Sequence, residues 1–262
     1  MGTLQGNWIW YELITSDPAG AKLFYEAVVG WSMTTGHGAN DTEYGFITAQ
    51  DGAMTGGVLQ LKPEMTQNGA RPCWLGYVGV EDVDDSVKAI AAAGGKILMS
   101  AMDVEMAGRV ALVSDPGGAA FYVMTPTPPP GGGQSTAFSA MPNAGHCGWN
   151  ELVADDAARE IGFYTGLFGW KLPEPMDMGP MGQYQFVAHD GVTVGAIMGK
   201  PPQVPVSAWA PYFWVSSIDA AQAAVAANGG TVFNGPHQVP GDLWVIQGTD
   251  PQGAVFSLTG HK

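Results

Sequence analysis

The chain is internally duplicated, and this duplication constrains its fold more than any other feature. The residues from Trp10 to Trp31 are matched by those from Trp149 to Trp170 at a constant offset of 139 residues, without a gap. Later pairs extend the match: Asp51-Gly52 with Asp190-Gly191, Gly94-Gly95 with Gly229-Gly230, and Asp115-Pro-Gly-Gly with Asp250-Pro-Gln-Gly. A period this long indicates two tandem domains rather than a solenoid of short units.

Composition limits the partners that such a protein can have. The 262 residues are 46% apolar and 13% charged, enough for two domains with cores of their own. A net charge of −14 argues against a nucleic acid or an anionic membrane as partner. A small hydrophobic or aromatic molecule fits better. We find no secretory leader pattern at the N-terminus and no apolar run of about 18 residues, so we expect a soluble, cytoplasmic protein.

Each repeat has the pattern of two strand–helix–strand–strand–strand units. The first unit begins with an alternating strand at residues 8–15, and Ser16-Asp17-Pro18 then supplies an N-cap and a first-turn proline for a helix. Asp155-Asp156 caps the matching helix of the second repeat. The last unit is expected to contain strands at 212–215, 231–233, 244–247 and 254–258 and a helix at 218–227. The unit βαβββ is therefore predicted four times.

The repeats are joined by a segment with linker composition. Residues 125–144 contain a proline run followed by glycines, so we predict domains at 1–124 and 145–262. The two cysteines, Cys73 and Cys147, fall at unrelated places in the two repeats, which excludes a duplicated disulfide and favours free thiols.

A set of motifs found in both repeats resembles one known superfamily. Phe24-Tyr25, Gly30 and Asp115-Pro116, each with a counterpart in the second repeat, resemble the glyoxalase, bleomycin-resistance and extradiol dioxygenase (vicinal oxygen chelate) superfamily. Trp-x-Glu-Leu in the first strand is similar to its tandem, glyoxalase-like branch. The resemblance implies an α+β fold of two tandem domains, each a pair of βαβββ units forming a half-open barrel with a ligand on its concave side. We also expect the two halves to pair within one chain, with a homodimer as the alternative.

The resemblance further implies where metal ligands would lie, and these positions lack them. The first-strand histidine position falls on Trp10 and Trp149, and the last-strand glutamate position on Tyr122 and Ser257. The middle-strand histidine of some dioxygenases would fall near Leu75 and Ala210. Indole and leucine offer a metal no lone pair, and a phenol or hydroxyl is a poor neutral ligand. We therefore expect no metal and no other cofactor.

A glutamate stands beside each of these tryptophans. Alternation along a strand puts Trp10 with Glu12, and Trp149 with Glu151, on the face that the resemblance turns toward the cavity. A carboxylate in an apolar, aromatic cavity has its pKa raised by desolvation and can act as a general acid or base. The competing interpretation is structural, because a buried glutamate can equally accept hydrogen bonds from backbone amides or a tryptophan N–H.

The remaining candidate residues would bind rather than react. The aromatic side chains Trp10, Tyr44, Tyr122, Trp149 and Tyr184, with Ser257, invite a stacking site for an aromatic ligand, although aromatic residues in strands often belong to the core.

Three functional hypotheses follow. The first is a metal-independent enzyme of lyase, isomerase or hydratase type that uses Glu12 or Glu151 on a small aromatic or carbonyl-bearing metabolite. The second is a protein that binds a hydrophobic molecule without converting it. The third is a metal-dependent lyase or dioxygenase whose ligands have moved to Glu12, Glu151 and a histidine.

Overall fold

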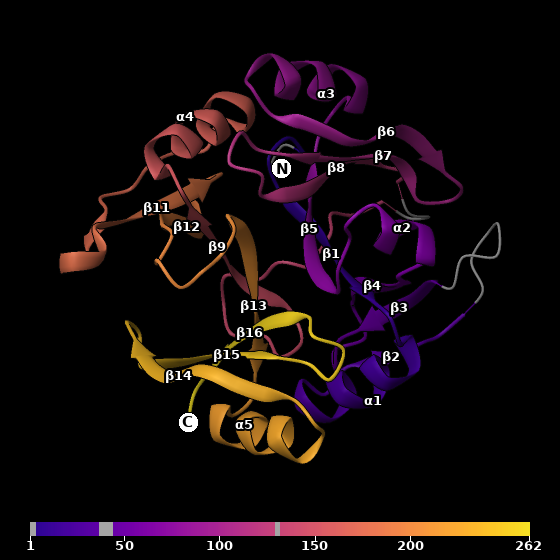
Figure 1. Cartoon of the computed structure of the whole chain (residues 1–262), viewed down its shortest axis with the longest axis vertical. Helices are drawn as coiled ribbons and strands as arrows, with labels where there is room; N and C mark the ends of the chain where they lie inside the picture. The colour runs from indigo at the N-terminus through magenta and orange to yellow at the C-terminus, as the bar shows by residue number, and fades with distance from the viewer. Residues whose placement is uncertain (1–3, 37–43, 129–131) are drawn as a thin grey trace. The chain divides into compact units, whose positions relative to one another are not determined.

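The computed structural model describes residues 4–36, 44–128 and 132–262 (Figure 1). The helices and strands of the first repeat are β1 (Trp8–Thr15), α1 (Pro18–Val28), β2 (Ser32–Met33), β3 (Tyr44–Thr48), β4 (Met54–Gln60), α2 (Pro63–Gln67), β5 (Cys73–Gly79), α3 (Val83–Ala92), β6 (Lys96–Val104), β7 (Gly108–Ser114) and β8 (Ala120–Pro126). Those of the second repeat are β9 (Cys147–Ala154), α4 (Ala157–Phe168), β10 (Met176–Asp177), the 3₁₀ helix η2 (Gly179–Met181), β11 (Gln183–His189), β12 (Val192–Gly199), β13 (Ala208–Val215), α5 (Ile218–Ala227), β14 (Thr231–Val239), β15 (Leu243–Thr249) and β16 (Val255–Gly260).

Each repeat forms one eight-stranded sheet, and the two sheets have the same strand order. The order is β2-β3-β4-β1-β5-β8-β7-β6 in the first repeat and β10-β11-β12-β9-β13-β16-β15-β14 in the second. Within each βαβββ unit the first and last strands pair in parallel, as β1 does with β4 and β5 with β8, and the hairpin strands pair antiparallel. These features confirm the predicted α+β fold of two tandem domains. Each sheet ends in two edge strands, so it is open and not a closed barrel.

The predicted capping residues start the helices. The Asp17 carboxylate accepts a hydrogen bond from the Gly20 backbone N–H at 2.9 Å, and Pro18 occupies the first turn of α1. Asp156 caps α4 in the same way, because its carboxylate accepts a hydrogen bond from the Arg159 backbone N–H at 3.0 Å. The buried stripe of α1 is the one that helical spacing predicts, and it contains Ala21, Phe24, Tyr25 and Val28.

One strand is longer than its prediction. The strand predicted at 231–233 continues to Val239 as β14, because its pairing with β15 resumes after register shifts at Val232/Asn234 and at Asn234/His237. Asn234-Gly235-Pro236 has the composition of a turn, but in the sheet it forms irregularities within one long strand. At the predicted linker, β8 continues to Pro126, and residues 129–131 lie outside the described part. The domain boundaries stay a prediction.

The chain divides into two compact units, and each unit contains one βαβββ module from each repeat. Unit 1 comprises Met1–Ile9, Gly76–Gln134 and Trp149–Ala210, and unit 2 comprises Trp10–Leu75, Ser135–Gly148 and Pro211–Lys262. In unit 2, α1 packs beside α5 (Figure 1), and the rings of Phe24 and Phe256 lie 5.6 Å apart. In unit 1, α3 contacts α4.

A buried tyrosine from one repeat binds a buried aspartate from the other in unit 2. The Tyr25 hydroxyl donates to Asp250 at 3.1 Å and accepts from the Trp74 indole N–H at 3.0 Å. Asp250 also accepts from the backbone N–H of Ala254 at 2.8 Å, within the Asp-Pro-Gln-Gly turn. Burial raises the pKa of the Asp250 carboxyl.

Unit 1 contains the same arrangement with the repeats exchanged. The Tyr164 hydroxyl donates to Asp115 at 3.1 Å and accepts from the Trp209 indole N–H at 2.7 Å. Asp115 accepts from the Ala119 N–H at 2.8 Å, and burial raises the pKa of its carboxyl as well. In both units, therefore, the tyrosine of a Phe-Tyr motif in one repeat is hydrogen-bonded to the aspartate of the Asp-Pro motif in the other repeat.

Candidate functional site

The first candidate glutamate is held by a tyrosine, and the tyrosine is held by a tryptophan. In unit 2, the Trp10 indole N–H donates to the Tyr44 hydroxyl at 3.1 Å, and Tyr44 is hydrogen-bonded to the Glu12 carboxylate. Because a carboxylate only accepts, the Tyr44 hydroxyl is the donor. Trp10, Glu12 and Tyr44 form what we call the first carboxylate cluster. It lies on one face of β1, opposite Tyr11, which is fully buried.

The second repeat builds the same cluster in unit 1. The Trp149 indole N–H donates to the Tyr184 hydroxyl at 2.9 Å, and that hydroxyl donates to Glu151 Oε2 at 2.6 Å. The Trp149 and Tyr184 rings are nearly parallel, with centroids 6.5 Å apart. Trp149, Glu151 and Tyr184 are the second carboxylate cluster. The structure thus brings together, repeat by repeat, six of the residues that the sequence marks as site candidates.

A phenylalanine completes the aromatic wall of each cluster. Phe46 packs edge-on against Trp10 at 6.5 Å and Tyr44 at 5.6 Å, and 47% of its surface is exposed. Phe186 takes the same place beside Trp149, at 6.0 Å. Each carboxylate is therefore set among aromatic rings, which can offer apolar faces to a flat ligand.

Burial and the adjacent carboxylate keep both tyrosines protonated. The pKa of Tyr44 lies well above its usual value, mainly because the side chain is buried and next because Glu12 is negatively charged. The pKa of Tyr184 is raised by burial and then by Glu151. Both phenols therefore keep their proton at neutral pH and remain donors to the carboxylates. Burial, with the charge of Glu12 second, also raises the pKa of the Cys73 thiol to about 12, so this cysteine is not a thiolate nucleophile at neutral pH.

The two glutamates differ in exposure. Glu12 is 2% exposed, whereas Glu151 is partly exposed. Each glutamate accepts a hydrogen bond from a tyrosine, but only Glu151 is open to solvent. Glu151 is the better placed of the two to meet a ligand.

The other two candidates, Tyr122 and Ser257, belong to separate clusters in the second module of each repeat. In unit 1, Tyr122 stacks on Tyr77 with ring centroids 4.2 Å apart and planes 18° apart. In unit 2, Ser257 lies opposite Tyr212 in the parallel pairing of β13 with β16, and both hydroxyls accept from the amide of Gln247. Tyr77, Tyr212 and Gln247 are neighbours of these candidate residues that the sequence alone did not mark.

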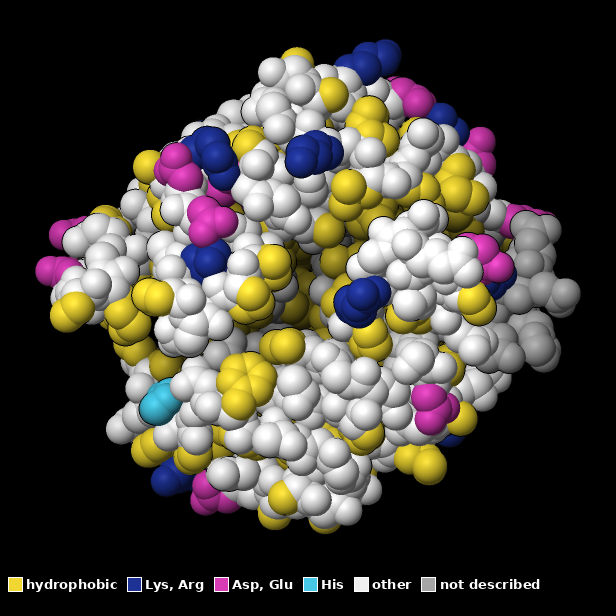
Figure 2. Space-filling model, viewed as in Figure 1, with side chains coloured by type: hydrophobic (Ala, Val, Ile, Leu, Met, Phe, Trp, Pro, Cys, Tyr) yellow, Lys and Arg dark blue, Asp and Glu magenta, His cyan; other side chains and the backbone are white. Residues whose placement is uncertain are grey.

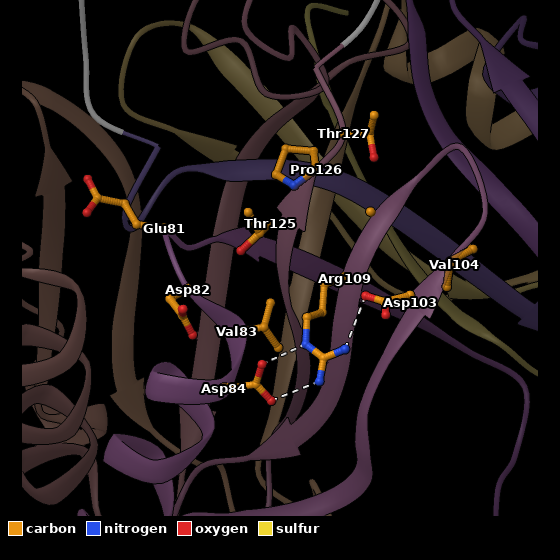
Figure 3. A pocket seen from close by; sticks show the side chains of 11 residues that line it. Glu81, Asp82, Val83, Asp84, Asp103, Val104, Arg109, Thr125, Pro126 and Thr127 are labelled. Carbon is orange, nitrogen blue, oxygen red and sulfur yellow. Dashed lines mark hydrogen bonds and ion pairs between the residues drawn. The ribbon is translucent and has the colours of Figure 1, made fainter.

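A cavity in unit 1 lies away from all eight candidate residues. It has a volume of about 400 Å³, and its lining includes Asp84, Asp103 and Arg109 (Figure 3). Arg109 donates to both Asp84 oxygens, at 2.7 and 2.9 Å, and to Asp103 at 3.1 Å, so its guanidinium is already engaged. Because exposed ion pairs of this kind are common on protein surfaces, we place the candidate site at the carboxylate clusters.

The model of the Glyoxalase/Bleomycin resistance protein/Dioxygenase superfamily matches residues 9–123 and again 144–258. The chain therefore belongs to this family, as a tandem member with one match in each repeat. This confirms the resemblance drawn from the motifs.

Relatives at about 30% identity span nearly the whole chain. "Putative glyoxylase CFP32" of Mycobacterium bovis is 30% identical over 257 residues, covering 97% of this chain and 94% of the relative. "Anthracycline biosynthesis protein DauV" of Streptomyces sp. (strain C5) is 31% identical over 267 residues, covering 95% of this chain and 91% of the relative. Among solved structures, the Mn(II)-bound glyoxalase from Novosphingobium aromaticivorans has a TM-score of 0.61 at 16% identity, with 99% of this chain and 82% of that chain covered. The similarity to this solved structure supports the fold alone.

The metal that other members of the family bind does not fit the donors of this chain. At the ligand positions implied by the resemblance, the Trp10 and Trp149 indoles are donors to tyrosines, and Tyr122 is stacked on Tyr77. Ser257 offers only a neutral hydroxyl. Within the described ranges 4–36, 44–128 and 132–262, no group of three or more His, Cys, Asp or Glu side chains is placed to hold a metal ion. We therefore derive no step through a metal.

We expect the purified protein to contain no stoichiometric Zn, Fe, Ni or Mn, because its first-strand and last-strand ligand positions carry indole, phenol and hydroxyl groups. Elemental analysis after dialysis without chelator is the measurement. One tightly held metal per chain, whose removal abolishes activity, would show that this expectation is wrong.

Proposed function

We propose that the chain is a metal-independent enzyme that acts on a small aromatic or carbonyl-bearing metabolite by acid–base chemistry at a carboxylate. The reaction would be of lyase, isomerase or hydratase type. The observation that carries the proposal is the 2.6 Å hydrogen bond from Tyr184 to Glu151 in an aromatic, partly exposed setting. Glu12 is the counterpart in the first repeat.

The arrangement suits a general base. Trp149 fixes the Tyr184 hydroxyl, and Tyr184 fixes the carboxylate, so little reorganisation is needed when a ligand arrives. The carboxylate would take a proton from a carbon next to a carbonyl, and the electron pair of that C–H bond would move into the carbonyl as an enolate. The carboxyl of the partly exposed Glu151 would exchange this proton with water and then protonate the carbon again, so that the enolate returns to the ketone and the carboxylate is regenerated.

The aromatic surroundings support the choice of ligand class. Phe186 packs edge-on against Trp149, whose indole donates to the tyrosine that holds Glu151, and aromatic walls of this kind favour flat, apolar molecules. One relative is named for anthracycline biosynthesis, and anthracyclines are polycyclic aromatic ketones, which is compatible with a carbonyl-bearing aromatic ligand here.

Binding without chemistry is the second candidate, and the burial of Glu12 favours it. A carboxylate that is 2% exposed and already bonded to Tyr44 can serve to orient the hairpin β3–β4 rather than to react. The duplicated clusters would then hold a hydrophobic molecule in a sequestering protein. A metal-dependent reaction with relocated ligands has no comparable support among the residues that the structure describes.

Proton exchange tests the proposal without knowledge of the full reaction. The aromatic ketone 2-hydroxyacetophenone carries exchangeable hydrogens next to its carbonyl, and their replacement in D₂O can be followed by NMR. We expect the wild-type protein to accelerate exchange well above a buffer control. Exchange at the buffer rate, with tight retention of the same ketone, would favour the binding protein instead.

We propose no nucleic-acid or membrane partner. On the face shown in Figure 2, the basic side chains of the described residues are scattered among acidic and apolar side chains. No described helix combines the length and apolar character needed to cross a membrane.

We further propose that the two repeats pair within one chain, since each compact unit takes a module from both. The full chain should then sediment as a monomer at low micromolar concentration. Dimers that survive strong dilution would contradict intramolecular pairing and support the homodimer.

A further inference from the structure

The two sheets end in matching edge strands that carry different side chains. Strand β6 is an edge of the first sheet, and β14 takes the same place in the second. Each pairs with the next strand of its own sheet in the same register, with register shifts at matching positions. The two edges therefore differ in their side chains rather than in their backbone pairing.

The first repeat exposes apolar side chains along this edge. We call them the β6 strip: Ile97, Leu98, Met102, Val104 and, in the turn after β6, Met106. The second repeat has His237 in the register position of Met102, and β14 also contains Pro236, which has no backbone N–H to donate. Polar side chains and proline protect an edge strand from pairing with other chains. Residues 96–104 contain no proline, so β6 is the less protected of the two edges.

A methionine in an unfavourable backbone conformation lies at the tip of the same hairpin. Met106 has φ 63° and is 90% exposed. The matching turn of the second repeat has Gly241 in its middle position, at φ 88°. Glycine adopts positive φ without a steric cost, whereas a side chain is strained there. Because Met106 is so exposed, packing within the chain does not offset this strain, and such strain is typical of functional positions.

The β6 strip borders an acidic cavity in unit 1. Val104 belongs to the strip and also lines the cavity of about 400 Å³ that contains Arg109 (Figure 3). Among the described lining residues, one guanidinium stands against four carboxylates, those of Glu81, Asp82, Asp84 and Asp103. The cavity therefore favours a cation beside an apolar surface.

The charge of the chain decides which kind of partner fits this surface. A second copy carries the same net charge of −14 and the same acidic cavity, so electrostatic repulsion opposes its approach. A basic segment of another protein is attracted by both. Exposed methionines suit such a contact, because their flexible side chains adapt to the surface of a partner.

We propose that the β6 strip is the docking surface for an extended, apolar and basic segment of a partner protein. The segment lies along β6, and its apolar side chains contact Met102, Val104 and Met106. A lysine or arginine side chain of the segment enters the acidic cavity. The surface belongs to the first repeat alone, and it adds a protein partner to the small-molecule function proposed above.

Fluorescence anisotropy with labelled peptides about ten residues long, enough to span a strand, tests the proposal. One peptide alternates valine with lysine, a second alternates valine with glutamate, and a third alternates serine with lysine. The valine–lysine peptide should bind the full chain about tenfold more tightly than either of the others, because only this peptide offers both apolar contacts and positive charge.

Met106→Gly copies Gly241 and separates docking from folding. It should weaken binding of the valine–lysine peptide by about fivefold through lost apolar contact. The urea midpoint should stay or rise, because glycine relieves the strain. Met102→His copies His237 and should weaken binding in the same way at about pH 8, where imidazole is neutral. Met141→Gly makes the same exchange at an exposed methionine of unit 2, and this matched control should leave binding unchanged.

Asp103→Gln tests the charge of the cavity. It copies Gln238, which takes the register position of Asp103 in the second repeat. The two hydrogen bonds from Arg109 to Asp84 stay in place. Binding of the valine–lysine peptide should weaken by about threefold at low salt, and the difference from the wild type should shrink as salt is added.

Three results would overturn the proposal. The first is equal binding of the valine–lysine peptide and either of the other peptides. The second is unchanged binding in both Met106→Gly and Met102→His, which would exclude the β6 strip. The third is a wild-type dimer that Met106→Gly dissociates, since a second copy would then cover the strip. None of these measurements involves hydrogen exchange at Glu151, so the proposed function succeeds or fails separately.

Discussion

Changing Glu151 to glutamine should lower the catalysed hydrogen exchange of 2-hydroxyacetophenone by about 10²–10⁴-fold. The glutamine keeps the size of the side chain and can still accept from Tyr184, whose hydroxyl lies 2.6 Å from Glu151 Oε2. It lacks the basic lone pair that takes the proton. Fold and ligand retention should therefore survive while exchange falls.

Glu12→Gln is the internal control for this experiment. Glu12 has the same tyrosine partner but is 2% exposed, so its replacement should leave exchange near the wild-type rate. If the glutamates are structural, each change should instead lower the free energy of unfolding by about 1–3 kcal/mol without altering exchange. Unchanged exchange in both variants would remove the acid–base mechanism and favour the binding protein.

Changing Asp115 to alanine should lower the free energy of unfolding by about 3 kcal/mol, because several buried donors would lose their acceptor together. These donors include the Tyr164 hydroxyl at 3.1 Å and the Ala119 N–H at 2.8 Å. Urea denaturation of the full chain is the measurement. Tyr164→Phe removes one donor and leaves Asp115 in place, so it should cost only about 1 kcal/mol. A loss below about 0.5 kcal/mol for Asp115→Ala would show that the turn does not depend on this carboxylate.

The same aspartates should give a defined pH dependence. Burial raises the pKa of Asp115 and Asp250 in the folded protein, so protonation favours the folded state. Their stabilising contribution is complete below the ordinary carboxyl pKa and is lost as the pH rises through the folded-state pKa. The stability of the wild type relative to an Asp115→Asn, Asp250→Asn double variant should therefore increase as pH falls from about 7 to 4. This comparison cancels the effects of other carboxylates.

Local signals in the sequence were sufficient for much of the fold. Asp17-Pro18 and Asp155-Asp156 mark helix starts because capping depends on residues only three positions apart. Alternation along the first strand places Trp10 and Glu12 on one face because a strand has a side-chain period of two. Because each local signal occurs in both repeats, the elements predicted for the first domain also predict those of the second.

The hydrogen bonds of the site could not be predicted in the same way. Tyr44 reaches Glu12 because β4 of the hairpin β3–β4 pairs with β1, and this pairing joins residues 45 positions apart in the sequence, such as Glu12 and Gly57. The continuation of β14 through Asn234 and His237 was not predicted, because Asn-Gly-Pro has the composition of a turn, whereas pairing with β15 continues the strand through it. Tertiary pairing overrides local preference at such positions.

The exchanged tyrosine–aspartate contacts also affect how the chain can fold during synthesis. Asp115 belongs to the first repeat, but its hydroxyl donor, Tyr164, follows 49 positions later. Tyr25, also in the first repeat, donates to Asp250, which lies 225 positions further along the chain. A nascent chain that has emerged only through the first repeat would therefore hold Tyr25 and Trp74 without their aspartate. Contacts so distant in sequence slow folding and leave apolar surface exposed in the interval. The hydrogen bond between Tyr25 and Asp250 can form only after β15, the last strand but one of the chain, has been synthesised.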